Sequence, residues 1–86
     1  MFVYVLRSEW DGKRYVGLAE DVERRLLEHN RGVTKSTRGR RPFVLVYVEE
    51  FATLTGARRR EKYSKTAAGR RFLGKIEQGR PLSSTG

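Results

Sequence analysis

The dipeptide Asp11-Gly12 separates two segments rich in strand-forming residues, and it constrains the fold more than any other feature of the sequence. Segment 2–6 precedes it and segment 13–18 follows it. A type I′ turn requires positive φ at both central residues, and Asp-Gly meets that requirement readily. The sequence therefore predicts a β-hairpin, so the chain begins with two antiparallel strands that are neighbours in a sheet.

A helix is expected after the hairpin, from Val22 to Asn30. Acidic residues at its start complement the helix dipole, and Gly32 supplies a stop signal beyond its end. The residues on one stripe of this helix are Val22, Arg25, Leu26 and His29. We expect that stripe to border the sheet, whereas Arg24 lies on the opposite side with Glu28 and is expected to be solvated.

The rest of the chain predicts one more strand and two more helices. The expected elements are a mobile basic loop at 31–42, a strand at 43–48, a helix from Thr53 or Thr55 to about Lys65, a helix from Ala67 to Ile76, and a flexible tail at 78–86. The strand is apolar on both faces in its first part, so we expect it at the centre of the sheet. Residues 1–77 would form a single domain.

The chain is short and contains no cysteine. With 86 residues and zero Cys, it has room for one domain and excludes zinc fingers, thiol catalysis and disulfide scaffolds. The longest uncharged apolar run, 43–48, has six residues, far fewer than the ~20 that cross a bilayer. No secretory signal is recognisable at the N-terminus, so we expect a cytoplasmic protein that does not bind membranes.

Positive charge is concentrated in the second half of the chain. The formal net charge is +9, and residues 31–86 hold fourteen bases and four acids. Most of the bases are arginines, whose planar guanidinium pairs with phosphate through two hydrogen bonds. Nucleic acid is therefore the expected partner, although a basic surface that serves only solubility is the alternative. The residues expected to contact it are Lys35, Arg38, Arg40, Arg41, Arg58, Lys62 and Lys65.

Glu61 is the best-placed candidate for a metal ligand. With one His and no Cys, a metal site must rely on oxygen ligands, which favours Mg²⁺ or Mn²⁺. Glu61 lies in the most basic stretch of the chain and on the side of its helix that also carries Ala57. The alternative interpretation is structural, because Glu61 also has the spacing of an ion-pair partner for Lys65.

Four other side chains are candidates for chemistry on a phosphodiester. Arg25 could bind the phosphate or could cover the edge of the core with its aliphatic stem. His29 could act as a base or donor, or could interact with the helix dipole. Tyr4 and Tyr15 could be ordinary core aromatics. A phenol titrates near pH ~10, so a catalytic tyrosine would need neighbouring positive charge.

The order of these residues along the chain resembles the GIY-YIG nuclease family, especially its small stand-alone members. The segments that carry the resemblance are Val3-Tyr4-Val5, Tyr15-Val16-Gly17, Asp21, Glu23-Arg24-Arg25-Leu26, Glu28-His29-Asn30, Arg41-Pro42 and Arg60-Glu61-Lys62. The likeness covers about residues 2–76. It extends to the nuclease domains of structure-selective repair endonucleases and of the bacterial excision-repair endonuclease.

The resemblance implies an α+β fold, with a three-stranded antiparallel sheet flanked by about three helices and a one-metal hydrolytic site on one sheet face. Tyr15 would be the general base or would orient the attacking water, Arg25 would stabilise the scissile phosphate, and Glu61 would bind Mg²⁺ or Mn²⁺. Tyr4 would shape the site and His29 would support it. Gly17 would let a helix or the substrate backbone approach closely.

The chain departs from the family pattern in two places. The first motif begins with Phe2-Val3 in place of Gly-Ile, which preserves the strand. Leu18 stands where some repair members have Lys, so one phosphate contact is absent. All three core roles are filled, and the resulting prediction is a metal-dependent DNA endonuclease acting in repair, recombination or DNA processing. A non-catalytic nucleic-acid-binding module is the alternative, and a targeting protein could supply selectivity.

Overall fold

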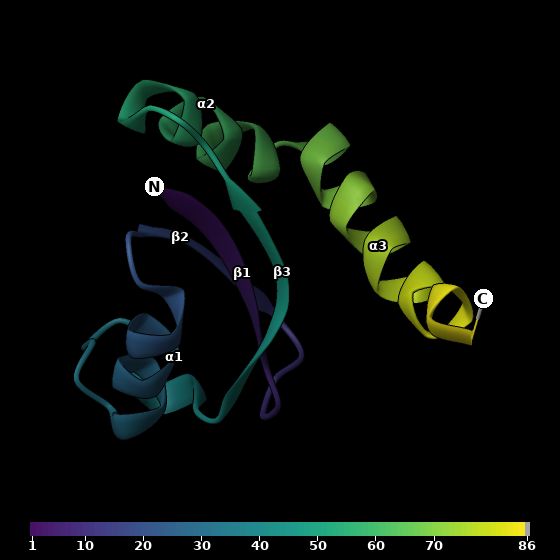
Figure 1. Cartoon of the computed structure of the whole chain (residues 1–86). Coiled ribbons are helices and arrows are strands. Elements are labelled where there is room, and N and C mark those ends of the chain that lie inside the picture. The colour runs from purple at the N-terminus through teal and green to yellow at the C-terminus, as the bar shows by residue number, and fades with distance from the viewer. Residues whose placement is uncertain (86) are drawn as a thin grey trace.

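The computed structural model describes the backbone of residues 1–85 and the side chains of residues 1–78. The elements are β1 (Phe2–Ser8), β2 (Arg14–Ala19), α1 (Val22–Arg31), the short 3₁₀ helix η1 (Arg38–Arg40), β3 (Phe43–Glu50), α2 (Leu54–Ser64) and α3 (Ala67–Thr85). The expected α+β fold is confirmed. Figure 1 shows α1 and α3 on opposite sides of one curved sheet.

The sheet is antiparallel, and its strand order is β2-β1-β3. The prediction that the third strand is central is therefore wrong, because β3 pairs with the outer side of β1. Residues Val3 to Leu6 of β1 are at most 1% exposed, whereas Leu45 and Val48 of β3 are 37% and 43% exposed. β3 is an edge strand with one neighbour. Its apolar side chains are partly covered on both faces of the sheet, and this accounts for the apolar run.

Each face of the sheet has its own hydrophobic cluster. On the face covered by α1, called the α1 face below, Tyr4, Leu6 and Phe43 pack together. On the opposite face, Val5 and Val46 pack against Leu73 of α3. The alternation of β1 side chains thus sends Tyr4 to the α1 face and its neighbour Val5 to the other.

Caps at both ends fix the position of α1. The Asp21 side chain accepts a hydrogen bond from the Arg24 N–H, and Gly32 adopts a positive φ of 81° while its N–H bonds to carbonyls of the last turn. A left-handed C-cap of this kind favours glycine. The helix therefore ends one residue beyond the prediction and turns the His29 side chain inward.

The two C-terminal helices meet at a tight junction. Thr53, one of the two predicted caps of α2, accepts the Gly56 N–H at 3.1 Å. A Cβ at Gly69 would overlap the Tyr63 carbonyl, so glycine permits the close approach of α3 to α2. Helix α3 continues past Ile76 into residues of the expected tail at 78–86, and the domain boundary at residue 77 stays a prediction. No helix among the described residues has the length and apolar character needed to cross a membrane.

Candidate active site

Tyr4 lies at the centre of the α1 face and crosses over Gly17. These two residues are direct partners in the β1–β2 register. A Cβ at position 17 would lie 2.6 Å from both Cζ and the hydroxyl of Tyr4. The space left by Gly17 is therefore filled by the Tyr4 ring, and not by a helix or a substrate backbone as the sequence suggested.

A chain of buried hydrogen bonds runs from Tyr4 through α1 to the basic loop. The Tyr4 hydroxyl lies 3.0 Å from His29 Nε2, and His29 Nδ1 lies 2.8 Å from Thr37 Oγ1. The Thr37 hydroxyl donates to the Thr34 carbonyl at 3.4 Å. Thr37 must then accept from Nδ1–H, which leaves Nε2 to accept the Tyr4 proton. One neutral tautomer of His29 satisfies the whole chain.

Burial sets the protonation states in this network. Tyr4 is 1% exposed, and His29 and Thr37 are 0% exposed. Burial raises the pKa of Tyr4, with the neighbouring Arg25 guanidinium acting in the opposite direction. Burial also lowers the pKa of His29, assisted by the charge of Arg25 and opposed by Glu28. Near neutral pH, Tyr4 therefore stays protonated and His29 stays uncharged.

Tyr15 completes an aromatic cluster at the edge of this network. Its ring centroid lies 4.8 Å from that of His29 and 6.3 Å from that of Tyr4. Tyr15 is half-buried, and within residues 1–78 its hydroxyl has no hydrogen-bond partner. The phenol oxygen is thus held in place by ring packing while its polar end remains available to water or substrate.

Arg25 lies beside the cluster and is held by Glu28. Its Nη1 is 2.6 Å from Glu28 Oε1, and its side chain is 34% exposed. Glu28 also pairs with Arg24 at 3.3 Å, so it bridges the two arginines and does not simply face away with Arg24. Arg24 is 76% exposed, in agreement with its prediction as a solvated charge.

Glu61 does not contact the aromatic cluster. Its Oε2 pairs with Lys65 Nζ at 3.0 Å, which is the structural alternative raised by the sequence. No group of three or more metal-ligating side chains occurs among the described residues. A partly exposed single carboxylate still fits Mg²⁺ or Mn²⁺, because these cations often take one protein carboxylate with waters and substrate phosphate.

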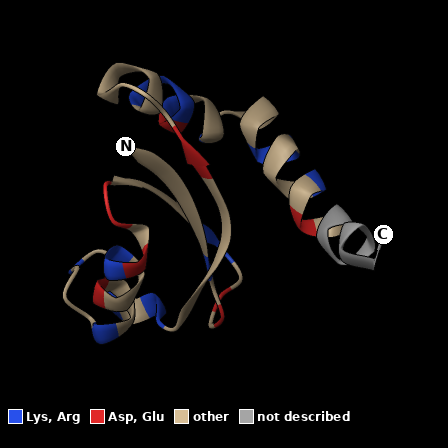
Figure 2. Cartoon of the chain, in the orientation of Figure 1, with Lys and Arg blue, Asp and Glu red and all other residues tan. Residues whose placement is uncertain are grey.

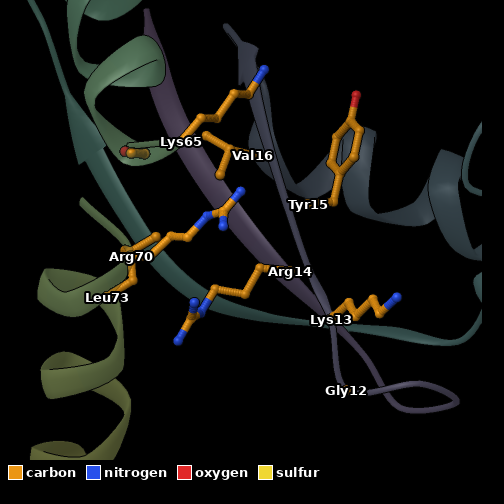
Figure 3. A pocket seen from close by; sticks show the side chains of 9 residues that line it. Gly12, Lys13, Arg14, Tyr15, Val16, Lys65, Arg70 and Leu73 are labelled. Atoms are coloured by element: carbon orange, nitrogen blue, oxygen red, sulfur yellow. The ribbon is translucent and has the colours of Figure 1, made fainter. Parts of the chain in front are cut away.

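A basic cavity lies beside the helix that carries Glu61, on the sheet face opposite the Tyr15 ring. The cavity is about 640 Å³ and lies between β2 and the α2–α3 junction. Figure 3 shows Lys65 and Arg70 beside Val16, with Tyr15 projecting from the other side of β2. Lys65, the ion-pair partner of Glu61, lines this cavity. Tyr15 also borders the cavity, but its ring packs against His29 on the α1 face, so the cavity does not bring Glu61 to the phenol.

The basic loop is folded onto the protein and is not a free arm. Arg40 pairs with Asp11 at 3.0 Å and lies over the Phe43 ring. Arg38 and Arg41 donate to backbone carbonyls of the loop, Gly32 and Arg38 respectively. Figure 2 shows basic residues on all three helices. The predicted contacts that are exposed are Lys35, Arg38, Arg41, Arg58, Lys62 and Lys65, whereas Arg40 is half-buried.

Two residues that build the site carry no role in the sequence interpretation. Thr37 is buried and orients His29, yet in the sequence it is one hydroxyl residue among several in a polar loop. Asn30 donates to the Phe43 carbonyl at 3.1 Å and accepts its N–H at 2.6 Å, joining the end of α1 to the start of β3. In the sequence, the only sign that Asn30 matters is that it belongs to a segment that resembles the family.

Comparison with known proteins identifies the family. Residues 1–73 match the family described as the GIY-YIG catalytic domain. The chain belongs to the GIY-YIG family. This family consists of nucleases, so the resemblance inferred from the sequence is confirmed.

Several small bacterial proteins match nearly the whole GIY-YIG chain. A UPF0213 protein of Staphylococcus saprophyticus is 39% identical, with 91% of this chain and 95% of that protein covered. A UPF0213 protein of Staphylococcus epidermidis is 40% identical over the same shares. The solution NMR structure of the UPF0213 protein BH0048 from Bacillus halodurans is 36% identical and covers 91% of this chain and 85% of that chain, with a TM-score of 0.55.

Proposed function

We propose that this GIY-YIG protein is a divalent-metal-dependent endonuclease that hydrolyses phosphodiester bonds in DNA. The observation that carries the proposal is the buried Tyr4–His29–Thr37 network, which supports the accessible Tyr15 phenol with Arg25 at its edge. Buried polar networks cost stability unless every member is satisfied, and this one is fully satisfied. The basic second half of the chain supports nucleic acid as the substrate.

Tyr15 would activate or orient the attacking water. Its hydroxyl has no protein partner among residues 1–78, and its ring is fixed against a neutral imidazole. Tyr4 would keep its proton and direct it to His29, so this buried side chain would shape the site.

Arg25 would bind the scissile phosphate. Glu28 holds the guanidinium through Nη1, and the planar guanidinium has further N–H groups that could bind phosphate oxygens. Such a contact is strongest where negative charge develops in the transition state.

Glu61 would hold Mg²⁺ or Mn²⁺ together with substrate phosphate and water. When bound, the cation would polarise the phosphate and stabilise the leaving oxygen. The Lys65 ammonium now paired with Glu61 would have to move aside, and its exposed side chain can do so. The proposal includes Mg²⁺ or Mn²⁺ as the cation and a role in DNA repair, recombination or processing. It also includes a cytoplasmic location and a protein partner that directs the enzyme to its substrate.

The decisive experiment measures cleavage of single-stranded, duplex and branched DNA with Mg²⁺ or Mn²⁺. Wild type should cut at least one substrate, and Tyr15→Phe and Arg25→Gln should lose activity while remaining folded. Arg24→Gln is the matched control, because it removes an adjacent exposed charge from the same helix. Equal cleavage by Tyr15→Phe and wild type would remove Tyr15 from the mechanism.

The alternative, a non-catalytic nucleic-acid-binding module, is favoured by the charge distribution alone. It predicts salt-dependent binding, no metal-dependent cleavage of any substrate, and no effect of Tyr15→Phe. The same assays therefore separate the two functions.

A further inference from the structure

Trp10 is a large aromatic side chain that the proposed active site does not use. It is the only Trp of the chain, and at 73% it is the most exposed large hydrophobic residue among residues 1–78. It lies between β1 and β2, in the turn of the hairpin whose second strand carries Tyr15. Figure 1 shows this hairpin at one edge of the sheet. A tryptophan exposed to this degree leaves most of its apolar surface in water, so it contributes little of the free energy that its burial would supply to folding.

The backbone beneath Trp10 is held rigidly. The buried Ser8 hydroxyl accepts the N–H groups of Trp10 and Asp11, each at 3.1 Å, and donates to the Arg40 carbonyl at 2.6 Å. The Asp11 carboxylate accepts the Lys13 N–H at 2.9 Å and pairs with Arg40. The protein therefore presents an exposed indole on an ordered turn, so little backbone entropy is lost when that indole binds a ligand.

The charges around the turn favour an anionic ligand. The two acids beside Trp10 are both paired, Glu9 with Arg7 at 3.7 Å and Asp11 with Arg40 at 3.0 Å. Within residues 1–78, the Lys13 ammonium has no acidic partner. A phosphate backbone that approaches the basic loop can therefore reach this tip without repulsion.

We propose that Trp10 is a nucleobase-stacking residue of the substrate site. Its ligand would be a base with an accessible flat face, either unpaired or at the end of a duplex, carried on a strand whose phosphates lie near Lys13 and the basic loop. An aromatic side chain beside cationic groups is a common arrangement for binding nucleic acid without sequence preference. The inference rests on the proposed nucleic-acid substrate and deepens it, because it specifies which bases the protein can engage.

A protein partner fits this surface less well. Protein interfaces have a contiguous apolar centre, whereas the neighbours of Trp10 in the turn are Glu9, Asp11 and Gly12. A single flat ring surrounded by polar groups fits the face of one nucleobase. It fits a cluster of apolar side chains on a protein partner less well.

The single Trp provides a direct test. An oligothymidylate is titrated into the protein in EDTA while tryptophan fluorescence is recorded, and a labelled copy reports binding independently by anisotropy. Fluorescence should be quenched as the complex forms, and Trp10→Ala should weaken binding at least about fivefold. Trp10→Phe, which keeps a flat aromatic face, should bind more tightly than Trp10→Ala. The slope of log affinity against log salt should stay unchanged in both, because no phosphate contact is lost.

Leu27→Ala is the matched control, since Leu27 is also exposed, at 61%, but lies on α1. Equal affinity of Trp10→Ala and Leu27→Ala, or saturated binding without a fluorescence change, would overturn the inference. Equal quenching by a duplex with closed hairpin ends would also overturn it, because that ligand has no free base face. If no DNA binds at all, both proposals fail. Quenching without metal-dependent cleavage would refute only the nuclease.

Discussion

The Tyr4 hydroxyl lies 3.0 Å from Nε2 of His29, and neither side chain reaches solvent. Because the other ring nitrogen of His29 bonds to Thr37, the position of the Tyr4 proton depends on a residue in the basic loop. The loop thus has two possible roles: its charges can attract the substrate, and its buried threonine orients the site.

Thr37→Val should destabilise the fold and impair the site. Valine has nearly the same shape but cannot accept the Nδ1–H of His29, so a buried donor loses its partner. We expect a loss of about 1–3 kcal/mol in the free energy of unfolding, measured by urea denaturation. Thr37→Ser keeps the hydroxyl and should retain most of the stability. Equal losses in the two variants would show that the methyl group, and not the hydrogen bond, matters.

The pKa of His29 should lie below its ordinary value of about 6.5. Because the folded pKa is lower than the unfolded one, the unfolded chain takes up a proton first as the pH falls. The free energy of unfolding should therefore be fully retained above pH ~6.5 and decline below it, toward the folded pKa. As this is the only His, its ring resonances give the pKa directly by NMR titration. A measured pKa above that of a free imidazole would contradict the buried neutral state.

Gly17→Ala should displace the Tyr4 ring. The added Cβ would lie 2.6 Å from Tyr4 Cζ, and Tyr4 has no free space because it is 1% exposed. Overpacking of this kind costs about 1–3 kcal/mol. Gly39→Ala is the control, because a Cβ there meets no atom within 4 Å. If Gly17→Ala were as stable as Gly39→Ala, the close contact between Tyr4 and Gly17 would be ruled out.

Local signals in the sequence predicted much of this fold, and non-local contacts account for what it missed. The Asp11-Gly12 hairpin and the Gly32 stop depend on backbone preferences of a few residues, so both could be recognised. The expected type I′ turn is wrong, however, because Gly12 has a positive φ of 74° and Asp11 does not. The position of β3 in the sheet depends on its pairing with β1, which lies far away in the sequence. The apolar pattern within β3 does not determine that pairing. Thr37 could not be identified either, since its role exists only when the loop packs against His29.

Arg40 and Arg38 should separate the structural and binding roles of the basic loop. Arg40 pairs with Asp11, whose pKa is lowered mainly by the Lys13 N–H and further by Arg40. Arg40→Gln should therefore lower the melting temperature more than Arg38→Gln. Arg38 is exposed, so Arg38→Gln should instead reduce the salt dependence of DNA binding by about one phosphate contact. The opposite pattern, seen by thermal denaturation and salt titration, would assign the DNA contact to Arg40.

Glu61→Gln tests whether the carboxylate paired with Lys65 holds a metal or only neutralises charge. If Glu61 binds the cation, the variant should lose metal-dependent cleavage at least about 100-fold. Its DNA affinity in EDTA should be equal to or slightly tighter than that of wild type, because one negative charge is removed from a basic surface. Glu50→Gln removes an exposed acid from β3 and should leave cleavage unchanged. A purely structural ion pair predicts a different result, in which Glu61→Gln cleaves as wild type does and Lys65→Gln has the same small effect on stability. Since an exposed ion pair contributes little to folding, a large loss of cleavage without a loss of stability would favour the metal-binding role.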